Sequence, residues 1–277
     1  MKLIKRLPLI FVLLLVGCTT TTFIYNRIDF LLPWYLGSYV ELTRDQKQYL
    51  DELLIPFFSW HRSEELPKYL EIINRTENIL EEEIQSENIA TIALSVEESW
   101  FRLEKEVLVR ILPLASDLSD EQVQSFLKVM QKKGREYENK YLGRSKKEYR
   151  QDAYDKMLNN LQRFMGELSQ QQLSLVKSYT EDMHRLDGAW LQNRKASMVS
   201  LSSILERDFG WKERLIRINQ RDDVVSQIYR DTYSHNLDLI YHLLTEVLNT
   251  RSEKQDQRLR RQLSKYRSDI ETLINNE

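Results

Sequence analysis

Hydrophobic residues recur at helical spacing along most of this chain. Leu103, Val107 and Ile111, for example, follow one another at steps of four, which places them on one face of a helix. The 277 residues include seven glycines and five prolines, and no proline follows Pro113. Because proline breaks helices, so long a stretch without it favours helix throughout. We therefore predict an all-α fold, an elongated antiparallel bundle of long amphipathic helices.

The pattern and its interruptions place the individual helices. A bend or a break is expected at Pro56, Gly188 is a weak point within a long helix, and a break near residues 219–222 is left open. A last, polar helix carries a narrow apolar stripe, which is typical of a helix that packs against one neighbour, as in a coiled coil. The predicted helices cover residues 43–62, 65–85, 88–114, 119–142, 145–165, 169–207, 212–250 and 252–275.

One helix-start signal occurs three times. In Leu42–Gln46, Thr43 can cap a helix and Gln46 can bond back to it, which forms a capping box. The pattern returns at Leu118–Gln122 and Leu168–Gln172, with serine as the cap. Three starts of one kind indicate a repeated helical-hairpin construction. Their spacings are unequal, 76 residues (122 minus 46) and then 50 (172 minus 122), so a regular solenoid is not predicted.

The amino terminus has the pattern of an export signal. A basic start precedes an apolar run, Leu7 to Val16, that is too short to span a bilayer. Leu15-Val16-Gly17-Cys18 is a lipobox, in which the cysteine is lipidated. We predict a lipoprotein signal peptide in residues 1–17, lipidated Cys18 and a tether in residues 18–22, and a single helical domain in residues 23–277, with a subdivision near 115–118 or 208–211 left open.

The anchor predicts where the protein works. Palmitate-type acyl chains on Cys18 would make membrane lipid the first partner, because more than one chain gives stable anchoring. Thr19 stands where an aspartate usually retains Gram-negative lipoproteins in the inner membrane, so we expect the periplasmic face of the outer membrane. Thr19 to Thr22 reach only about 13 Å, which holds the folded body near the lipid headgroups.

Composition excludes several kinds of chemistry. Cys18 is the only cysteine, so the mature domain has no disulfide and no thiol catalysis. The net charge is -2, and neither this balance nor an export signal suits a nucleic-acid partner. No phosphate-binding glycine loop and no Ser/His/Asp set occurs, and no cofactor is expected.

Two clusters are candidate sites. Trp60, His61, Arg62 and Glu65 lie close together between two prolines, either as a recognition site or as a helix–helix corner with internal hydrogen bonds. A second cluster, at helical spacing, is either a metal site lacking further ligands or a polar stripe between helices. Its members are Asp231, His235, Asp238 and His242.

Two weaker features were weighed as well. Glu181 and His184 have the spacing found in di-iron bundles, but no second such pair occurs. A basic run near the carboxyl end is a solvated face or a docking face for anionic lipid or a partner. It comprises Arg258, Arg260, Arg261, Lys265 and Arg267.

The ordered motifs resemble an uncharacterised family of Gram-negative lipoproteins, known as a domain of unknown function. The resemblance rests on short motifs along nearly the whole mature chain, among them Leu42–Gln46, Trp60–Arg62 and Gly166–Leu168, with Trp190 and Arg194. It implies a helical lipoprotein and carries over no catalytic residue. The Leu-Thr-x-x-Gln motif alone is also similar to that of small periplasmic stress chaperones, but helix capping explains all three copies without a shared function and is the favoured interpretation.

We therefore expect a lipid-anchored, non-enzymatic adaptor or scaffold for envelope biogenesis or maintenance, with an unknown envelope protein as its partner. Two alternatives stay open. One is a chaperone-like protein that holds unfolded clients. The other is a metal-dependent enzyme that uses the cluster from Asp231 to His242.

Overall fold

The computed structural model describes residues 25, 28–218 and 226–275. The fold is 84% helical, without a strand among these residues, and the helices form a bundle. The predicted all-α class is therefore confirmed. Within the described part of the chain, no helix is both long and apolar enough to cross a membrane.

The helices follow one another with short connections. In chain order they are α3 (Ile28–Gly37), α4 (Arg44–Trp60), the π-helical turn η1 (His61–Glu65), α5 (Leu66–Ile79), α6 (Ser86–Asp117), α7 (Asp120–Tyr141), α8 (Lys146–Met165), α9 (Gln170–Asp182), α10 (Asp187–Ile204), α11 (Trp211–Ile216), α12 (Gln227–Asn249) and α13 (Glu253–Asn275).

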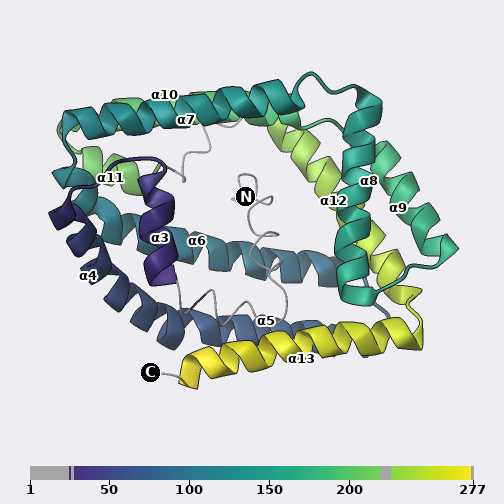
Figure 1. Cartoon of the computed structure of the whole chain (residues 1–277). Helices are drawn as coiled ribbons and strands as arrows, with labels where there is room; N and C mark the ends of the chain where they lie inside the picture. Colours follow the sequence, from purple (N-terminus) through teal and green to yellow (C-terminus); the bar gives the residue numbers. More distant parts are fainter. Residues whose placement is uncertain (1–24, 26–27, 219–225, 276–277) are drawn as a thin grey trace.

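The helices are arranged as a four-sided frame (Figure 1). Two sides are helix pairs, α7 with α10 and α5 with α13. The other sides contain α3 and α4 at one end and α8 and α9 at the other. The helices α6 and α12 pack against each other and tie the two ends together, α6 through α4 and α12 through α9.

The repeated start signals are real capping boxes, and their glutamines bind each other in pairs. Thr43 and Ser119 each cap a helix, with Gln46 and Gln122 bonding back. The Gln46 side-chain amide also donates to Gln122 Oε1 at 3.1 Å, and the Gln122 amide donates to Gln46 Oε1 at 2.7 Å. Two helix starts that lie 76 residues apart are thereby joined.

A second pair repeats this geometry at the other end of the frame. Ser169 caps α9, with Gln172 bonding back. Gln172 and Gln255 exchange amide hydrogen bonds of 3.1 and 2.9 Å. In both pairs each amide also donates to the backbone carbonyl five residues before its partner glutamine. These carbonyls belong to Asp117 and Glu41 in the first pair and to Thr250 and Glu167 in the second.

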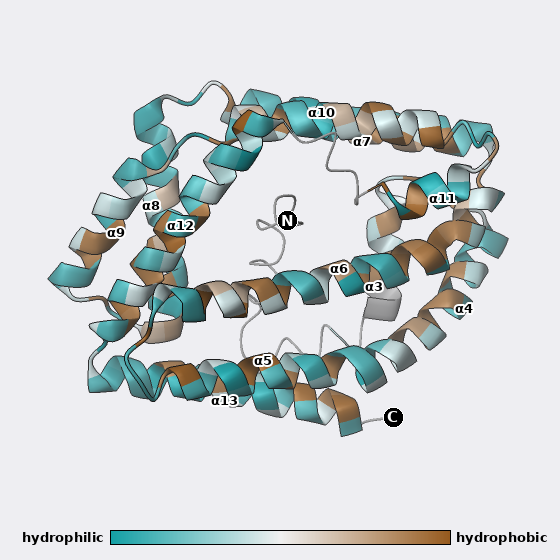
Figure 2. Cartoon of the chain, turned by 180° about the vertical axis from the view of Figure 1, so that it is seen from behind, coloured by the Kyte–Doolittle hydropathy of each residue, from teal (hydrophilic) through white to brown (hydrophobic). Residues whose placement is uncertain are grey.

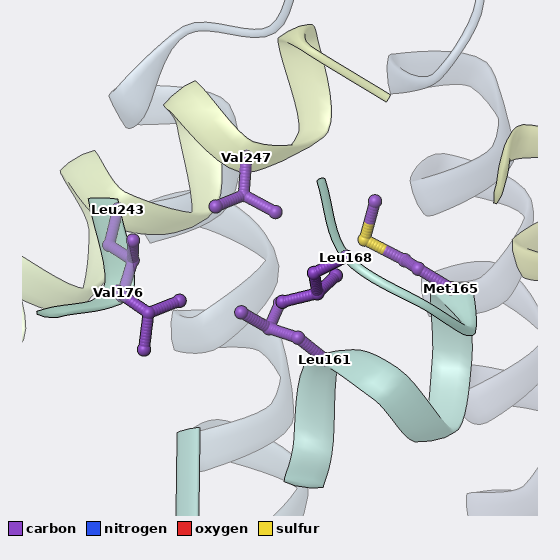
Figure 3. Close-up of a cluster of buried hydrophobic side chains, with 6 residues drawn as sticks. All are labelled: Leu161, Met165, Leu168, Val176, Leu243 and Val247. Atoms are coloured by element: carbon purple, nitrogen blue, oxygen red, sulfur yellow. The ribbon is translucent and has the colours of Figure 1, made fainter. Parts of the chain in front are cut away.

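Constant offsets relate the two ends of the frame. Leu42, Gln46 and Leu50 correspond to Leu168, Gln172 and Val176, an offset of 126 residues (172 minus 46). Later positions are offset by 133 (255 minus 122), which carries Leu114 to Val247. The core of the second end is drawn in Figure 3, where side chains of α8, α9 and α12 meet.

The fold is therefore an internal duplication with approximate two-fold symmetry. Helices α3, α4, η1 with α5, α6 and α7 correspond to α8, α9, α10, α12 and α13. The long sides exchange partners between the halves, since α5 packs on α13 and α10 packs on α7. The three sequence signals are unequally spaced because two of them lie in the first half and one in the second. A fourth box, in the second half, does not match the sequence pattern. That box is Ser252–Gln255, where Arg251 replaces the preceding leucine.

No helix ends at Pro56 or at Gly188, and the break considered near residues 219–222 lies outside the described residues. Pro56 lies inside α4 without ending it, and the helical path continues through η1 into α5. The predicted helix 169–207 ends at Asp182 and resumes at Asp187, just before Gly188. Figure 2 shows hydrophilic and hydrophobic residues alternating along most helices, as expected where one face of each helix is buried.

The glutamine pairs should stabilise the fold strongly. Gln172 is fully buried, so Gln172→Ala would leave the Ser169 N–H without its side-chain partner and would remove both amide hydrogen bonds to Gln255. We expect a loss of about 2–3 kcal/mol in the free energy of unfolding. The control is Gln257→Ala, which removes an exposed glutamine and should cost less than about 0.5 kcal/mol. Urea denaturation measures both, and equal midpoints would refute this role.

Candidate functional site

The cluster predicted around His61 lies at the π-helical turn between α4 and α5. The wider turn lets the helical path bend without a break and brings His61 and Glu65 to its inner side, where both are buried. Insertions of this kind occur often at functional sites. Trp60 is half-buried and contacts His61 edge-on.

The buried Glu65 forms an ion pair with the partly exposed Arg102 of α6. The Arg102 Nε donates to one carboxylate oxygen at 3.0 Å, and a terminal nitrogen donates to the other at 2.7 Å. Ser99 accepts a further bond from Arg102, and Lys68 lies 3.4 Å from the carboxylate. Because the fork satisfies both oxygens of a fully buried group, it fixes α5 against α6.

His61 is enclosed by aromatic rings. Phe57, Trp60 and Tyr69 contact it from its own helical path, and Tyr25 lies 5.5 Å away between ring centres. The Tyr25 hydroxyl and His61 Nδ1 are hydrogen-bonded at 3.0 Å. Burial lowers the pKa of His61 to about 4, so the ring is neutral at neutral pH. The arrangement binds the segment before α3 to the α4–α5 corner.

The other half contains an equivalent corner between α9 and α10. Tyr149 donates to the backbone carbonyl of His184 at 3.1 Å, 35 residues along, where Tyr25 and His61 are separated by 36. Asp187 replaces Glu65 as the buried carboxylate and is bound by Arg185 and Arg144. Although burial opposes it, these two guanidinium groups hold the pKa of Asp187 below its usual value.

The four residues proposed as metal ligands do not gather around one point. His235 stacks on His184 with ring centres 4.1 Å apart, and its Nε2 lies 3.3 Å from the carbonyl of Asp182. Asp231 accepts from Gln227, while Asp238 and His242 are exposed on α12. No group of three or more histidine, cysteine, aspartate or glutamate residues in the described part of the chain is placed to hold a metal ion.

The basic run near the carboxyl end takes part in packing. Arg260 bonds to Glu81 and Asp256, and Arg267 pairs with Glu77. These contacts dock α13 onto α5. The stretch therefore contributes to one long side of the frame, with Arg258 and Arg261 exposed.

One connection breaks the symmetry of the two halves. In the first half residues 80–85 join α5 to α6, whereas in the second half residues 205–226 join α10 to α12 and include α11. We name residues 205–218 the insertion loop. Its Phe209 is 100% exposed, more than any other large hydrophobic side chain in the described chain.

The insertion loop is held firmly beneath this exposed ring. Arg207 has a left-handed backbone, with φ of 58°, and its side chain donates to the carbonyls of Ser116 and Leu118. Arg214 donates to the Phe209 carbonyl at 2.8 Å. Trp211, which is part of the loop, is buried against Ile204 and Leu215. A left-handed conformation is costly for a residue other than glycine, so these contacts fix a loop that exposes its aromatic ring.

A surface groove lies beside the insertion loop, where Lys212 meets the end of α6. Its volume is about 570 Å³. Val109 contributes an apolar side chain that is 44% exposed. The lining residues are Val109, Leu112, Pro113, Ser116, Asp117 and Lys212. The insertion loop contributes Lys212 to this lining, three residues after the exposed Phe209.

Sequence analysis missed most of these partners. Arg102 and Asp187 occur in charged, ordinary-looking helices, and nothing local marks them as buried. The repeated tyrosine–histidine spacing of 36 and 35 residues was a usable signal. The predicted lipidation site, Cys18, lies outside the described residues.

The ion pair gives a first test of the corner. Arg102→Met should cost about 2–3 kcal/mol in the free energy of unfolding, because it removes two charge-assisted hydrogen bonds from the buried Glu65 carboxylate and leaves it paired with Lys68. The double variant Glu65→Leu with Arg102→Met should recover much of this loss. Denaturant titration compares them. Equal losses in the single and double variants would show that packing, and not charge, is at stake.

Acid should weaken the fold through His61. A histidine in the unfolded chain has a pKa of about 6.5, whereas the folded state binds the proton only near pH 4. Stability should therefore fall as the pH drops from 6.5 towards 4, by about 2 kcal/mol at pH 5. His61→Gln does not titrate and should lose less between pH 7 and pH 5 in urea denaturation. Parallel losses in both proteins would contradict this assignment.

Comparison with known proteins places the chain among uncharacterised sequences. No curated protein matches it, and no solved structure does. One family model matches residues 38–233, described as a family of unknown function, DUF6279. The match runs from the first capping box into α12 and so covers most of both halves. The chain belongs to this family of unknown function, DUF6279.

Proposed function

We propose that this protein is a lipid-anchored, non-enzymatic adaptor on the periplasmic face of the outer membrane, and that it binds an envelope protein through the insertion loop. The anchor and location rest on the lipobox at Leu15–Cys18 and on Thr19. The proposal of partner binding rests chiefly on Phe209, a fully exposed aromatic ring on a loop that side-chain bonds hold in place.

The duplication supports this choice of surface. The capping boxes, the glutamine pairs and both buried corners occur in each half and serve to hold the frame together. The insertion loop has no counterpart, so the symmetric fold does not require it. Loops on a rigid scaffold often carry function, and exposed aromatic anchors beside an apolar groove are typical of binding hot spots.

A client-holding chaperone is the second candidate. A groove of about 520 Å³ between α7 and α10 favours it, because its lining includes Met130, Met198 and Val199. Flexible methionine side chains suit surfaces that accept varied partners. Arg194, Lys195 and Glu138 border this groove and limit its apolar area.

Site-specific photo-crosslinking distinguishes the two functions. A photo-reactive phenylalanine analogue replaces Phe209 in the full-length chain, or Val199 in the other groove, and cells are irradiated. An adaptor should give one or a few discrete products at position 209. Adding Val109→Asp should abolish them, because a charge in the apolar groove opposes docking.

The control and the contrary outcome are equally specific. Val109→Asp should leave the urea midpoint and any products at position 199 unchanged. Many heterogeneous products at position 199, with none at 209, would favour the chaperone. An absence of discrete products at position 209 would reject the adaptor surface.

A further inference from the structure

Helix α3 buries one face in the core and exposes aromatic side chains on another. Leu36 packs into the core with Val40 and Leu50. Trp34, however, is 74% exposed and Tyr35 is 52% exposed. The run from Leu31 to Leu36 has no charged or amide side chain. This stretch of α3 therefore lacks the polar outer face expected in water.

The duplication supplies an internal comparison. The counterpart of α3 is α8, which packs on α9 as α3 packs on α4. The exposed face of α8 carries Asp155, Lys156 and Asn159, the polar residues that a water-facing helix requires. The exposed residues of the two helices thus differ in chemistry, being aromatic on α3 and polar on α8.

The aromatic side chains of this surface carry polar groups and lie close to a lysine. The Tyr35 and Tyr39 hydroxyls are hydrogen-bonded at 2.8 Å, and the Lys133 amine of α7 lies 4.7 Å from the centre of the Tyr39 ring. We name the exposed Trp34 and Tyr35 of α3, together with the half-buried Tyr39 that follows the helix, the aromatic edge. Tryptophan and tyrosine, with an apolar body and a polar group, favour the boundary between lipid headgroups and acyl chains. A neighbouring lysine favours anionic headgroups.

Chain length brings this edge near a bilayer. Ten residues separate Cys18 from the start of α3, which is at most about 35 Å when extended. Tyr25 shortens the free part to seven residues, because its hydroxyl is bound to His61 and its ring contacts Phe58. At about 25 Å, this reach keeps the α3–α4 end of the frame beside the point of attachment.

We infer that the aromatic edge of α3 is a lipid-contact surface, which docks the frame on the bilayer that holds Cys18. The inference rests on the proposed lipid anchor for its location and gives that anchor an orientation. The α3–α4 end faces the headgroups, and α8 and α9 face away from them. The protein is thereby attached at two points, the acylated cysteine and the aromatic edge.

Fluorescence quenching by bilayer-resident bromine tests this surface. The chain from Cys18 onward is coupled through its single thiol to maleimide-headgroup lipid in vesicles of phosphatidylethanolamine and phosphatidylglycerol, with or without brominated acyl chains. Brominated chains should remove the emission contributed by Trp34. Trp34→Phe should show no such loss, because the other four tryptophans are buried or half-buried.

Two outcomes would overturn the inference. One is equal emission of the unmodified chain in brominated and unbrominated vesicles. The other is equal quenching in the Trp34→Phe variant. Because chemical coupling replaces cellular acylation, mass spectrometry of Cys18 from cells tests the anchor separately. An unacylated Cys18 would reject the proposed anchor without changing the result for α3.

Discussion

The frame depends on pairs of glutamine amides that complete each other's hydrogen bonds. Gln46 with Gln122 and Gln172 with Gln255 satisfy helix starts, partner amides and backbone carbonyls at once. A helix start leaves several N–H groups without partners, and burying them is costly. Each pair solves this problem for two helices together, which lets the ends of α4, α6, α7, α9, α12 and α13 meet inside the protein and not at its surface.

The sequence predicted the helix starts, because these depend on residues close together in the chain. Thr43, Ser119 and Ser169 begin helices because a hydroxyl at that position can bond to the backbone three residues on, and sequence shows this directly. Sequence could not show that Gln46 also binds Gln122, because that contact depends on the path of the chain through η1, α5 and α6. The box at Ser252 was missed since Arg251 supplies no apolar residue, although the paired glutamine is the feature that matters.

The same distinction between local pattern and distant contacts applies to the candidate sites. Trp60 to Glu65 attracted attention as an unusual cluster, and the structure uses His61 and Glu65 to bind neighbouring helices. The cluster from Asp231 to His242 follows helical spacing correctly, but spacing on one helix does not bring a ligand from another. Phe209 could not be recognised in advance, because an aromatic residue in a helix-rich sequence is ordinarily assigned to the core.

The exchange of partners between the halves has an evolutionary consequence. Because α5 pairs with α13 and α10 with α7, half of this chain alone would lack the partners of both these helices unless a second copy supplied them. Fusion of the two subunits of a homodimer would produce this exchange. A dimer must carry every feature twice, whereas a fused chain can vary its halves separately. One subunit equivalent could then acquire the aromatic helix and the other the exposed loop, giving a symmetric scaffold two unlike faces.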